Sequence, residues 1–210
     1  MKYKVMIVED QTMPRELFEL RIQASEHFEV ALSIDNAALA DVYCLRFPVD
    51  LILMDVVTRN GESGLDAAER IKRAFPQIKI IIVTSMPECS YLKRAKEIGV
   101  ESFWYKEEQR ESLLDVMERT MNGESVYPGA SPELTLGMAS SYQFTERELD
   151  ILREITSGDT NQEIADRLNM SVATVKTHIL NMLEKTGFRN RTELAVRARE
   201  SGLVILNRRN

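Results

Sequence analysis

Val5-Met6-Ile7-Val8-Glu9-Asp10 is a short apolar run that ends in two carboxylates. Similar apolar runs recur over the first 123 residues and alternate with amphipathic stretches of helical period; they are Phe28 to Leu32, Leu51 to Met54, Ile80 to Val83 and Ser102 to Tyr105. Alternating strands and helices predict a parallel sheet with helices on both faces, where continuously apolar strands are buried on both sides. We therefore predict an α/β doubly wound parallel sheet of five strands in the order 2-1-3-4-5.

The regular periodicity lapses between Asn122 and Tyr142, where glycine, proline and serine accumulate as they do in linkers. Beyond this stretch, several cap residues each stand three positions before a glutamate, the pattern of a helix N-terminus. They are Thr145 with Glu148, Thr160 with Glu163 and Asn190 with Glu193. We therefore predict a first domain at 1–123, a linker at 124–142 and a small all-α domain of four helices at 143–210.

Composition and charge limit what the chain can do. With 44% hydrophobic and 29% charged residues it resembles a folded protein, and no apolar run reaches the ~18 residues of a membrane-spanning helix. The N-terminus lacks the apolar stretch of a signal peptide, so we expect a cytoplasmic protein without a membrane partner. The net charge of −6 is uneven: residues 1–142 hold 16 basic and 23 acidic side chains, and residues 143–210 hold 11 and 10. The two parts are expected to have different functions.

Carboxylates follow two of the predicted strands. Glu9 and Asp10 end the first strand, and Asp55 ends the third. In a doubly wound sheet the binding crevice lies beyond the carboxyl ends of the strands, where the winding reverses between the first and third strands. Carboxylates crowded there repel one another unless a cation neutralises them, and an all-oxygen site favours Mg²⁺. The sequence therefore predicts Mg²⁺ as the cofactor.

Two further groups stand at strand ends, the hydroxyl of Thr84 after the fourth strand and the ammonium of Lys106 after the fifth. Phosphoryl transfer depends mainly on positioning and electrostatic stabilisation. A nucleophilic carboxylate, a metal, a lysine and a hydroxyl are a sufficient set for it. We interpret this edge of the sheet as a site at which Asp55 accepts a phosphoryl group.

These residues resemble the response-regulator receivers of two-component signalling, a flavodoxin-like fold, over the entire first domain. The resemblance implies the following roles: acidic pocket, Glu9 and Asp10; phosphoacceptor, Asp55; metal ligands, Asp10, Asp55 and the backbone carbonyl of Val57; switch residues, Thr84 and Phe103; phosphate-binding residues, Thr84 and Lys106. It also implies a sensor histidine kinase as the phosphoryl donor.

The chain departs from the receiver pattern close to the site. Thr58-Arg59 stand where receivers usually have Met-Pro, and the loop to Gly64 is one residue longer. Glu107 replaces the proline that commonly follows the lysine, so no cis peptide is expected there. An atypical regulator that works independently of phosphorylation therefore stays an alternative. An aspartyl-phosphate hydrolase is a second one, but such enzymes usually carry another Asp two residues on, where this chain has Val57. We do not expect the protein to be an enzyme; the only reaction expected is self-catalysed phosphoryl transfer to and from Asp55.

The segments from Thr160 to Leu168 and from Val172 to Thr186 have the length and tight connection of a helix-turn-helix. An apolar stripe predicts the buried side of the second helix: Val175, Ile179, Met182 and Leu183. The opposite side is centred on Thr177 and Asn181. Threonine and asparagine can hydrogen-bond to base edges, so this side is predicted to read DNA.

Three stretches, Phe144 to Glu148, Asn161 to Ala165 and Thr174 to Lys176, resemble the LuxR-type helix-turn-helix over residues 143 to about 206. Joined to a receiver, this domain resembles the NarL/FixJ class of response regulators. The resemblance implies base contacts from Lys176, Thr177, Leu180 and Asn181, with Asn161 and Thr174 toward phosphates. We also predict phosphate contacts from three further residues because they are positively charged: Lys185, Arg189 and Arg191.

In this class the last helix, Thr192 to Ser201 here, pairs two DNA-binding domains. We therefore expect a homodimer in the active state, bound to double-stranded promoter DNA at an inverted repeat with half-sites ~34 Å apart. A resting receiver in this class can mask the reading helix, and phosphorylation would shift the population toward an open state. RNA polymerase is a candidate further partner.

Overall fold

The computed structural model describes residues 2–85, 89–106, 111–129 and 133–204. These residues form two compact units, a first unit that ends at Gly129 and a second unit that follows it. No helix in the described part of the chain is long and apolar enough to cross a membrane.

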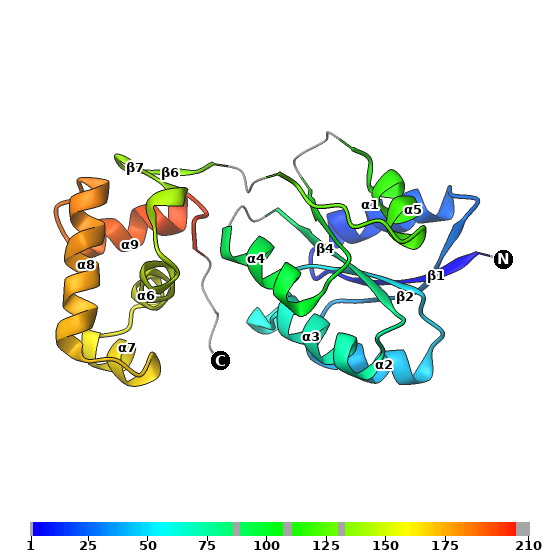
Figure 1. The fold of residues 1–210 in the computed structure, drawn as a ribbon, viewed down its shortest axis with the longest axis horizontal. Helices are drawn as coiled ribbons and strands as arrows, with labels where there is room; N and C mark the ends of the chain where they lie inside the picture. Colours follow the sequence, from blue (N-terminus) through cyan, green and yellow to red (C-terminus); the bar gives the residue numbers. More distant parts are fainter. Residues whose placement is uncertain (1, 86–88, 107–110, 130–132, 205–210) are drawn as a thin grey trace. The chain divides into compact units, whose positions relative to one another are not determined.

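The first unit is built on one parallel sheet (Figure 1). Its strands are β1 (Tyr3–Val8), β2 (Phe28–Ile34), β3 (Leu51–Met54), β4 (Lys79–Thr84) and β5 (Ser102–Tyr105). They are ordered β2-β1-β3-β4-β5, and every neighbouring pair is parallel. The predicted fold class and strand order are confirmed.

Helices cover both faces of this sheet (Figure 1). They are α1 (Thr12–Gln23), α2 (Ala40–Arg46), α3 (Gly64–Ala74), α4 (Cys89–Ile98) and α5 (Leu113–Met121), with short 3-10 helices at η1 (Ala37–Leu39) and η2 (Arg59–Gly61). Successive strand residues point to opposite faces. Val5 and Ile7 pack in one core with the buried sides of α1 and α5, whereas Met6 and Val8 pack in the other core, which α2, α3 and α4 complete.

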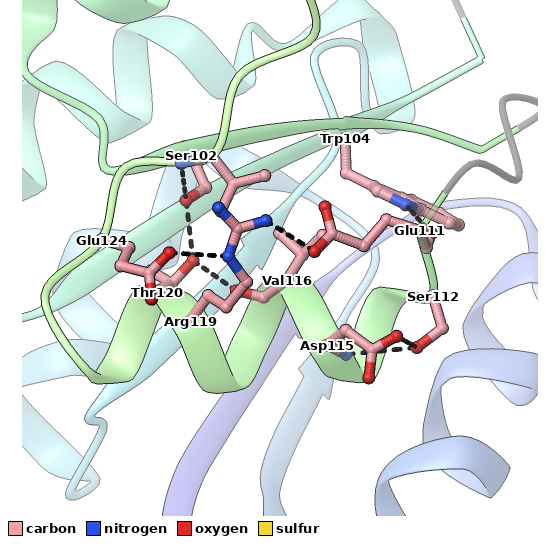
Figure 2. A network of polar contacts seen from close by, with 10 residues as sticks. Ser102, Trp104, Glu111, Ser112, Asp115, Val116, Arg119, Thr120 and Glu124 are labelled. Atoms are coloured by element: carbon pink, nitrogen blue, oxygen red, sulfur yellow. Dashed lines mark hydrogen bonds and ion pairs between the residues drawn. The ribbon is translucent and has the colours of Figure 1, made fainter.

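Part of the expected linker lies along β5, the edge strand of the sheet (Figure 2). The N–H of Phe103 donates to the carbonyl of Val126 at 2.8 Å, and the N–H of Val126 donates to the hydroxyl of Ser102 at 3.1 Å. Arg119 on α5 pairs with Glu124 at 2.7 Å. The chain is therefore anchored to the first unit beyond residue 123.

The second unit contains a hairpin of β6 (Thr135–Leu136) and β7 (Ala139–Ser140), the 3-10 helix η3 (Ser141–Gln143), and the helices α6 (Glu146–Thr156), α7 (Asn161–Arg167), α8 (Val172–Thr186) and α9 (Arg191–Glu200). Both Thr145 and Thr160 form reciprocal capping boxes, and the Asn190 side chain accepts the N–H of Glu193. The three predicted helix starts are confirmed.

The hairpin lies within the stretch that was predicted to be linker. Leu136 and Ala139 are buried in the core of the second unit, and the N–H of Met138 donates to the carbonyl of Thr186 at 3.0 Å. Gly137 turns the chain with φ 63°, and a Cβ there would lie 2.1 Å from the Thr186 oxygen. The second unit therefore begins ahead of residue 143, the start expected from the sequence.

Candidate functional site

Three carboxylates meet at the edge where β1 and β3 end. Glu9, Asp10 and Asp55 each place one oxygen within 4.8 Å of the other two. The backbone fixes this arrangement, because Asp55 N–H donates to the carbonyl of Val8 at 2.9 Å and extends the pairing of the two strands. Glu9 and Asp55 are buried, and Asp10 is partly exposed. The structure thus brings together the acidic residues that the sequence predicted to converge.

Lys106 lies between two of these carboxylates. Its Nζ atom donates to Oδ2 of Asp55 at 2.8 Å and to Oε2 of Glu9. The backbone N–H of Lys106 donates to the carbonyl of Thr84 at 2.9 Å, so the ends of β4 and β5 are held side by side. Thr84 is fully buried at the end of β4. The predicted hydroxyl and ammonium therefore come from adjoining strands, and the ammonium touches the predicted phosphoacceptor.

Burial dominates the electrostatics of this pocket. It raises the pKa of Asp55 to about 7, helped by the charge of Glu9 and opposed by Lys106 and by the N–H of Val56. Burial also opposes the charge of Lys106, but Asp55 and Glu9 outweigh it and raise the pKa of the ammonium. Among the described residues the pocket holds the ammonium of Lys106 and three carboxylates, so negative charge is in excess there. In the described part of the chain the cluster offers three carboxylate oxygens and no sulfur or nitrogen ligand, which fits a hard divalent cation such as Mg²⁺.

The loop after Asp55 is folded and tied down. Thr58 is only 2% exposed, and its hydroxyl accepts the N–H of Ala37 at 2.9 Å and donates to the carbonyl of Glu62 at 3.1 Å. Arg59 pairs with Asp35 at 2.7 Å. The two residues that replace the usual Met-Pro therefore connect this loop to the segment after β2. Nothing in the sequence indicates this role apart from the unusual threonine.

Gly64 closes the loop against the phosphoacceptor. Its N–H donates to the carbonyl of Val56 at 2.8 Å, and a Cβ at this position would lie 1.8 Å from the carbonyl oxygen of Asp55. Only glycine permits this approach of the α3 N-terminus to the end of β3.

The predicted switch aromatic, Phe103, is buried on β5. Its ring centroid lies 5.0 Å from that of Tyr105 and 6.4 Å from that of Tyr127. Tyr127 in turn donates its hydroxyl to the carbonyl of Val100 at 2.6 Å. Glu107, where the sequence departs from the receiver pattern, lies outside the described residues.

In the second unit, α7 and α8 form the predicted helix-turn-helix, and Asn169 with φ 51° makes the tight connection. Val175, Ile179 and Met182 are buried as expected, and Leu183 is partly buried. The opposite side of α8 is open to solvent. The exposed residues there include all four predicted base contacts: Lys176, Thr177, Leu180 and Asn181. Leu180 is 59% exposed.

Several predicted phosphate contacts have partners within the second unit. Lys185 donates to Glu148 at 2.7 Å and to the carbonyl of Gln143 at 2.9 Å. The Arg191 guanidinium donates to Oδ1 of Asn161 and to the carbonyl of Asp159. Arg189 and Thr174 are exposed. The structure therefore separates solvent-facing candidates from side chains that also stabilise the domain.

A doubly wound sheet with a pocket of carboxylates and a lysine, followed by a helix-turn-helix, defines a response regulator with a DNA-binding domain. The family described as response regulator receiver domain matches residues 5–118. The family described as bacterial regulatory proteins, luxR family, matches residues 142–198. The chain belongs to the LuxR-family response regulators, and we refer to its two units as the receiver domain and the DNA-binding domain.

Similar curated proteins span the whole chain. Response regulator protein VraR of Staphylococcus aureus strain Mu3 is 32% identical over 212 residues, which cover 97% of this chain and 100% of VraR. Its counterpart in Staphylococcus epidermidis is 33% identical with the same coverage. Family membership therefore applies to both domains together.

Solved structures share the fold. A structure of two RcsB dimers bound to two parallel DNAs aligns with a TM-score of 0.61 and 18% identity, covering 94% of this chain and 98% of that one. RcsB of Salmonella enterica serovar Typhimurium, bound to a promoter in the presence of the phosphomimetic BeF3−, aligns with a TM-score of 0.60 and 19% identity. The alignment covers 97% of this chain and 100% of that one. Response regulator ChrA of a heme-sensing two-component system aligns with a TM-score of 0.53 and 21% identity, covering 97% of this chain and 99% of that one.

Proposed function

We propose that a sensor histidine kinase phosphorylates Asp55 and that the phosphorylated chain dimerises and binds promoter DNA to control transcription. The observation that carries this proposal is the buried contact of Lys106 with both Asp55 and Glu9. A lysine in this position neutralises the charge that a phosphoryl group would add to Asp55.

The proposed reaction is a displacement at phosphorus. A carboxylate oxygen of Asp55 forms the new P–O bond, and the P–N bond to the kinase histidine breaks with its electron pair on the imidazole nitrogen, which is then protonated from solvent. Lys106 and Thr84 would hold the oxygens of the transferred group. Bound Mg²⁺ would supply positive charge to the same oxygens, with Asp10, Asp55 and the Val57 carbonyl as its protein ligands.

For DNA recognition we propose that the exposed side of α8 enters the major groove. Lys176, Thr177 and Asn181 supply hydrogen-bonding groups for base edges, and the exposed Leu180 offers an apolar contact for a thymine methyl. Thr174 and Arg189 are placed to contact phosphates. The side-chain oxygen of Asn161 accepts a hydrogen bond from Arg191, so the amide N–H groups of Asn161 point away from Arg191 and can donate to a phosphate.

We propose that α9 pairs two DNA-binding domains, so that the dimer reads an inverted repeat. RcsB, which shares the fold, has been solved as dimers on DNA. A contact with RNA polymerase would then convert promoter binding into a change in transcription.

Incubation with Mg²⁺ and acetyl phosphate tests the proposal. The mass of the intact chain should increase by one phosphoryl group, and Asp55→Ala should abolish the increase while circular dichroism shows an intact fold. Asp166→Ala, an exposed carboxylate on α7, is the matched control and should be phosphorylated normally. Beryllofluoride should raise the dimer fraction and the DNA affinity. No mass gain and no response to beryllofluoride would favour a phosphorylation-independent regulator, and steady hydrolysis of phosphoesters would favour a hydrolase.

A further inference from the structure

We infer that Thr58 is a positioning residue of the phosphoacceptor pocket. Its hydroxyl joins the loop after β3 to the segment after β2, and thereby holds the backbone carbonyl of the preceding residue, Val57, in place for a divalent cation. The inference rests on the proposed function and deepens it, because it assigns a part to a residue that does not touch the metal or the phosphoryl group.

The hydroxyl of Thr58 is used in both directions. It accepts the N–H of Ala37 at 2.9 Å, across 21 positions of sequence, and it donates to the carbonyl of Glu62 at 3.1 Å. The backbone N–H of Thr58 donates to the same Glu62 carbonyl at 3.0 Å. One side chain therefore fixes both the width of the loop and its distance from a separate segment.

The surroundings make these bonds important. Thr58 and Ala37 are both buried, so water cannot replace a lost partner. Removing the hydroxyl would leave the Ala37 N–H without an acceptor, and an unpaired buried donor costs more than an exposed one. The loop would then relax toward a geometry that satisfies Ala37 in another way.

Val57 is held on both sides by this arrangement. It forms an isolated antiparallel bridge with Ser63, and the residue before it accepts the N–H of Gly64. Those bonds lie within the loop itself. The backbone N–H of Arg59 donates to the carbonyl of Asp35 at 3.1 Å and is a further tie to the segment after β2. The Thr58 hydroxyl is the tie made by a buried side chain, so it should set where the Val57 carbonyl stands relative to Asp55.

Arg59 provides a second connection and a natural control. Its guanidinium pairs with Asp35 at 2.7 Å, but the side chain is 62% exposed. Exposed ion pairs contribute little because solvent and salt screen them. Removing the Arg59 side chain, which keeps the backbone bond to Asp35, should therefore leave the loop in place, whereas removing the Thr58 hydroxyl should not.

The test compares Mg²⁺ affinity of the full chain, measured by calorimetry, in three variants. Thr58→Val replaces the hydroxyl by a methyl group and should weaken Mg²⁺ binding by about tenfold or more, as is typical for residues that orient metal ligands. Thr58→Ser retains the hydroxyl and should stay within about threefold of wild type, as should Arg59→Ala. Melting temperatures with and without Mg²⁺ separate a loss of positioning from a general loss of stability. A loss of positioning reduces the rise in melting temperature that Mg²⁺ causes, and not only the melting temperature of the metal-free chain.

A wild-type measurement covers the case in which Thr58→Val does not fold. Mg²⁺ should slow hydrogen exchange of the Ala37 and Thr58 amides, because it immobilises the joined loops. Unchanged exchange at both amides, or wild-type Mg²⁺ affinity in Thr58→Val, would overturn the inference while leaving the proposed function intact. A wild-type chain that binds neither Mg²⁺ nor beryllofluoride would instead overturn the proposed function.

Discussion

Lys185 and Glu148 form an ion pair within the DNA-binding domain, with Nζ of Lys185 2.7 Å from Oε2 of Glu148. Glu148 is 2% exposed and also accepts the backbone N–H of Thr145 at the start of α6. Lys185 donates in addition to the carbonyl of Gln143. Lys185 therefore joins α8 to the start of α6, and its ammonium is engaged inside the domain.

Lys185→Met distinguishes this role from the phosphate contact that the sequence predicted. Because the substitution leaves a buried carboxylate without its cationic partner, we expect a loss of about 3 kcal/mol in the free energy of unfolding of the DNA-binding domain. Urea unfolding followed by circular dichroism measures it. At a temperature where the variant is folded, the salt dependence of DNA binding should be unchanged. A slope reduced by about 0.9 would show that Lys185 contacts a phosphate after all.

Glu148 also makes a prediction about pH. Burial opposes its charge, but the hydrogen bonds from Lys185 and Thr145 outweigh burial and hold the pKa of the carboxyl below its ordinary 4.5. Its contribution to the stability of the folded domain is therefore present above pH 4.5 and is lost as the pH falls through the lowered pKa. Unfolding free energies measured between about pH 5 and pH 3 should fall less steeply in Glu148→Gln than in wild type. Equal slopes would contradict the assignment.

The two ion-pair clusters differ in how far the sequence could predict them. Asp55 and Lys106 end parallel strands, and parallel strands present their carboxyl ends at one edge, so period and spacing were sufficient. Lys185 stands 37 positions from Glu148, and helical period gives only the face of a helix, not its neighbour. The positive charge of Lys185 is therefore all that the sequence offers, and it predicts a contact with a DNA phosphate.

The sequence could not show how far each domain extends into the expected linker, for a related reason. The hairpin around Gly137 has only two residues in each strand, and its glycine and serines have the composition of a linker. What makes it part of a domain is the contact of Met138 with Thr186, which no local pattern contains. Likewise, Tyr127 was assigned to the linker, although its hydroxyl donates to Val100 in the receiver domain.

The raised pKa of Asp55 predicts how pH affects Mg²⁺ binding. Burial raises this pKa to about 7, and a metal binds the ionised carboxylate, so a proton must leave below that pH. Mg²⁺ affinity should therefore be nearly constant above pH 7 and fall by up to about tenfold for each unit below it. Titrations with Mg²⁺ can be followed by the fluorescence of Trp104, the single tryptophan of the chain. They should be compared at pH 6 and pH 8, about one unit below and above the pKa of Asp55. Asp55→Asn should bind weakly and without this pH dependence; an identical pH profile in the variant would assign the proton elsewhere.

Gly64→Ala should damage both the fold and the pocket. A Cβ at this position would lie 1.8 Å from the backbone oxygen of Asp55, which cannot move aside as a side chain would. We expect a loss of about 3 kcal/mol in receiver stability, at the upper end for overpacking, with weaker Mg²⁺ binding. Gly129→Ala is the matched control, because nothing lies within 4 Å of a Cβ there. Chemical denaturation should give a lower unfolding midpoint for Gly64→Ala than for Gly129→Ala. Equal midpoints would mean that the α3 N-terminus can shift to make room for the Cβ.

Lys176 and Arg189 should affect DNA binding in different ways, although both are exposed cations. Lys176 lies on the proposed reading side of α8, so Lys176→Ala should cost about 1–3 kcal/mol on the cognate operator and much less on unrelated DNA. Arg189 follows the end of α8, where a phosphate contact would be independent of sequence. Arg189→Ala should therefore weaken binding to both DNAs equally and reduce the salt slope by about 0.9. Footprinting would first locate the operator, and fluorescence anisotropy at several salt concentrations would give the affinities. If Lys176→Ala weakens both DNAs equally, the side of α8 that carries Lys176 faces the backbone, and the docking must be rotated about the helix axis.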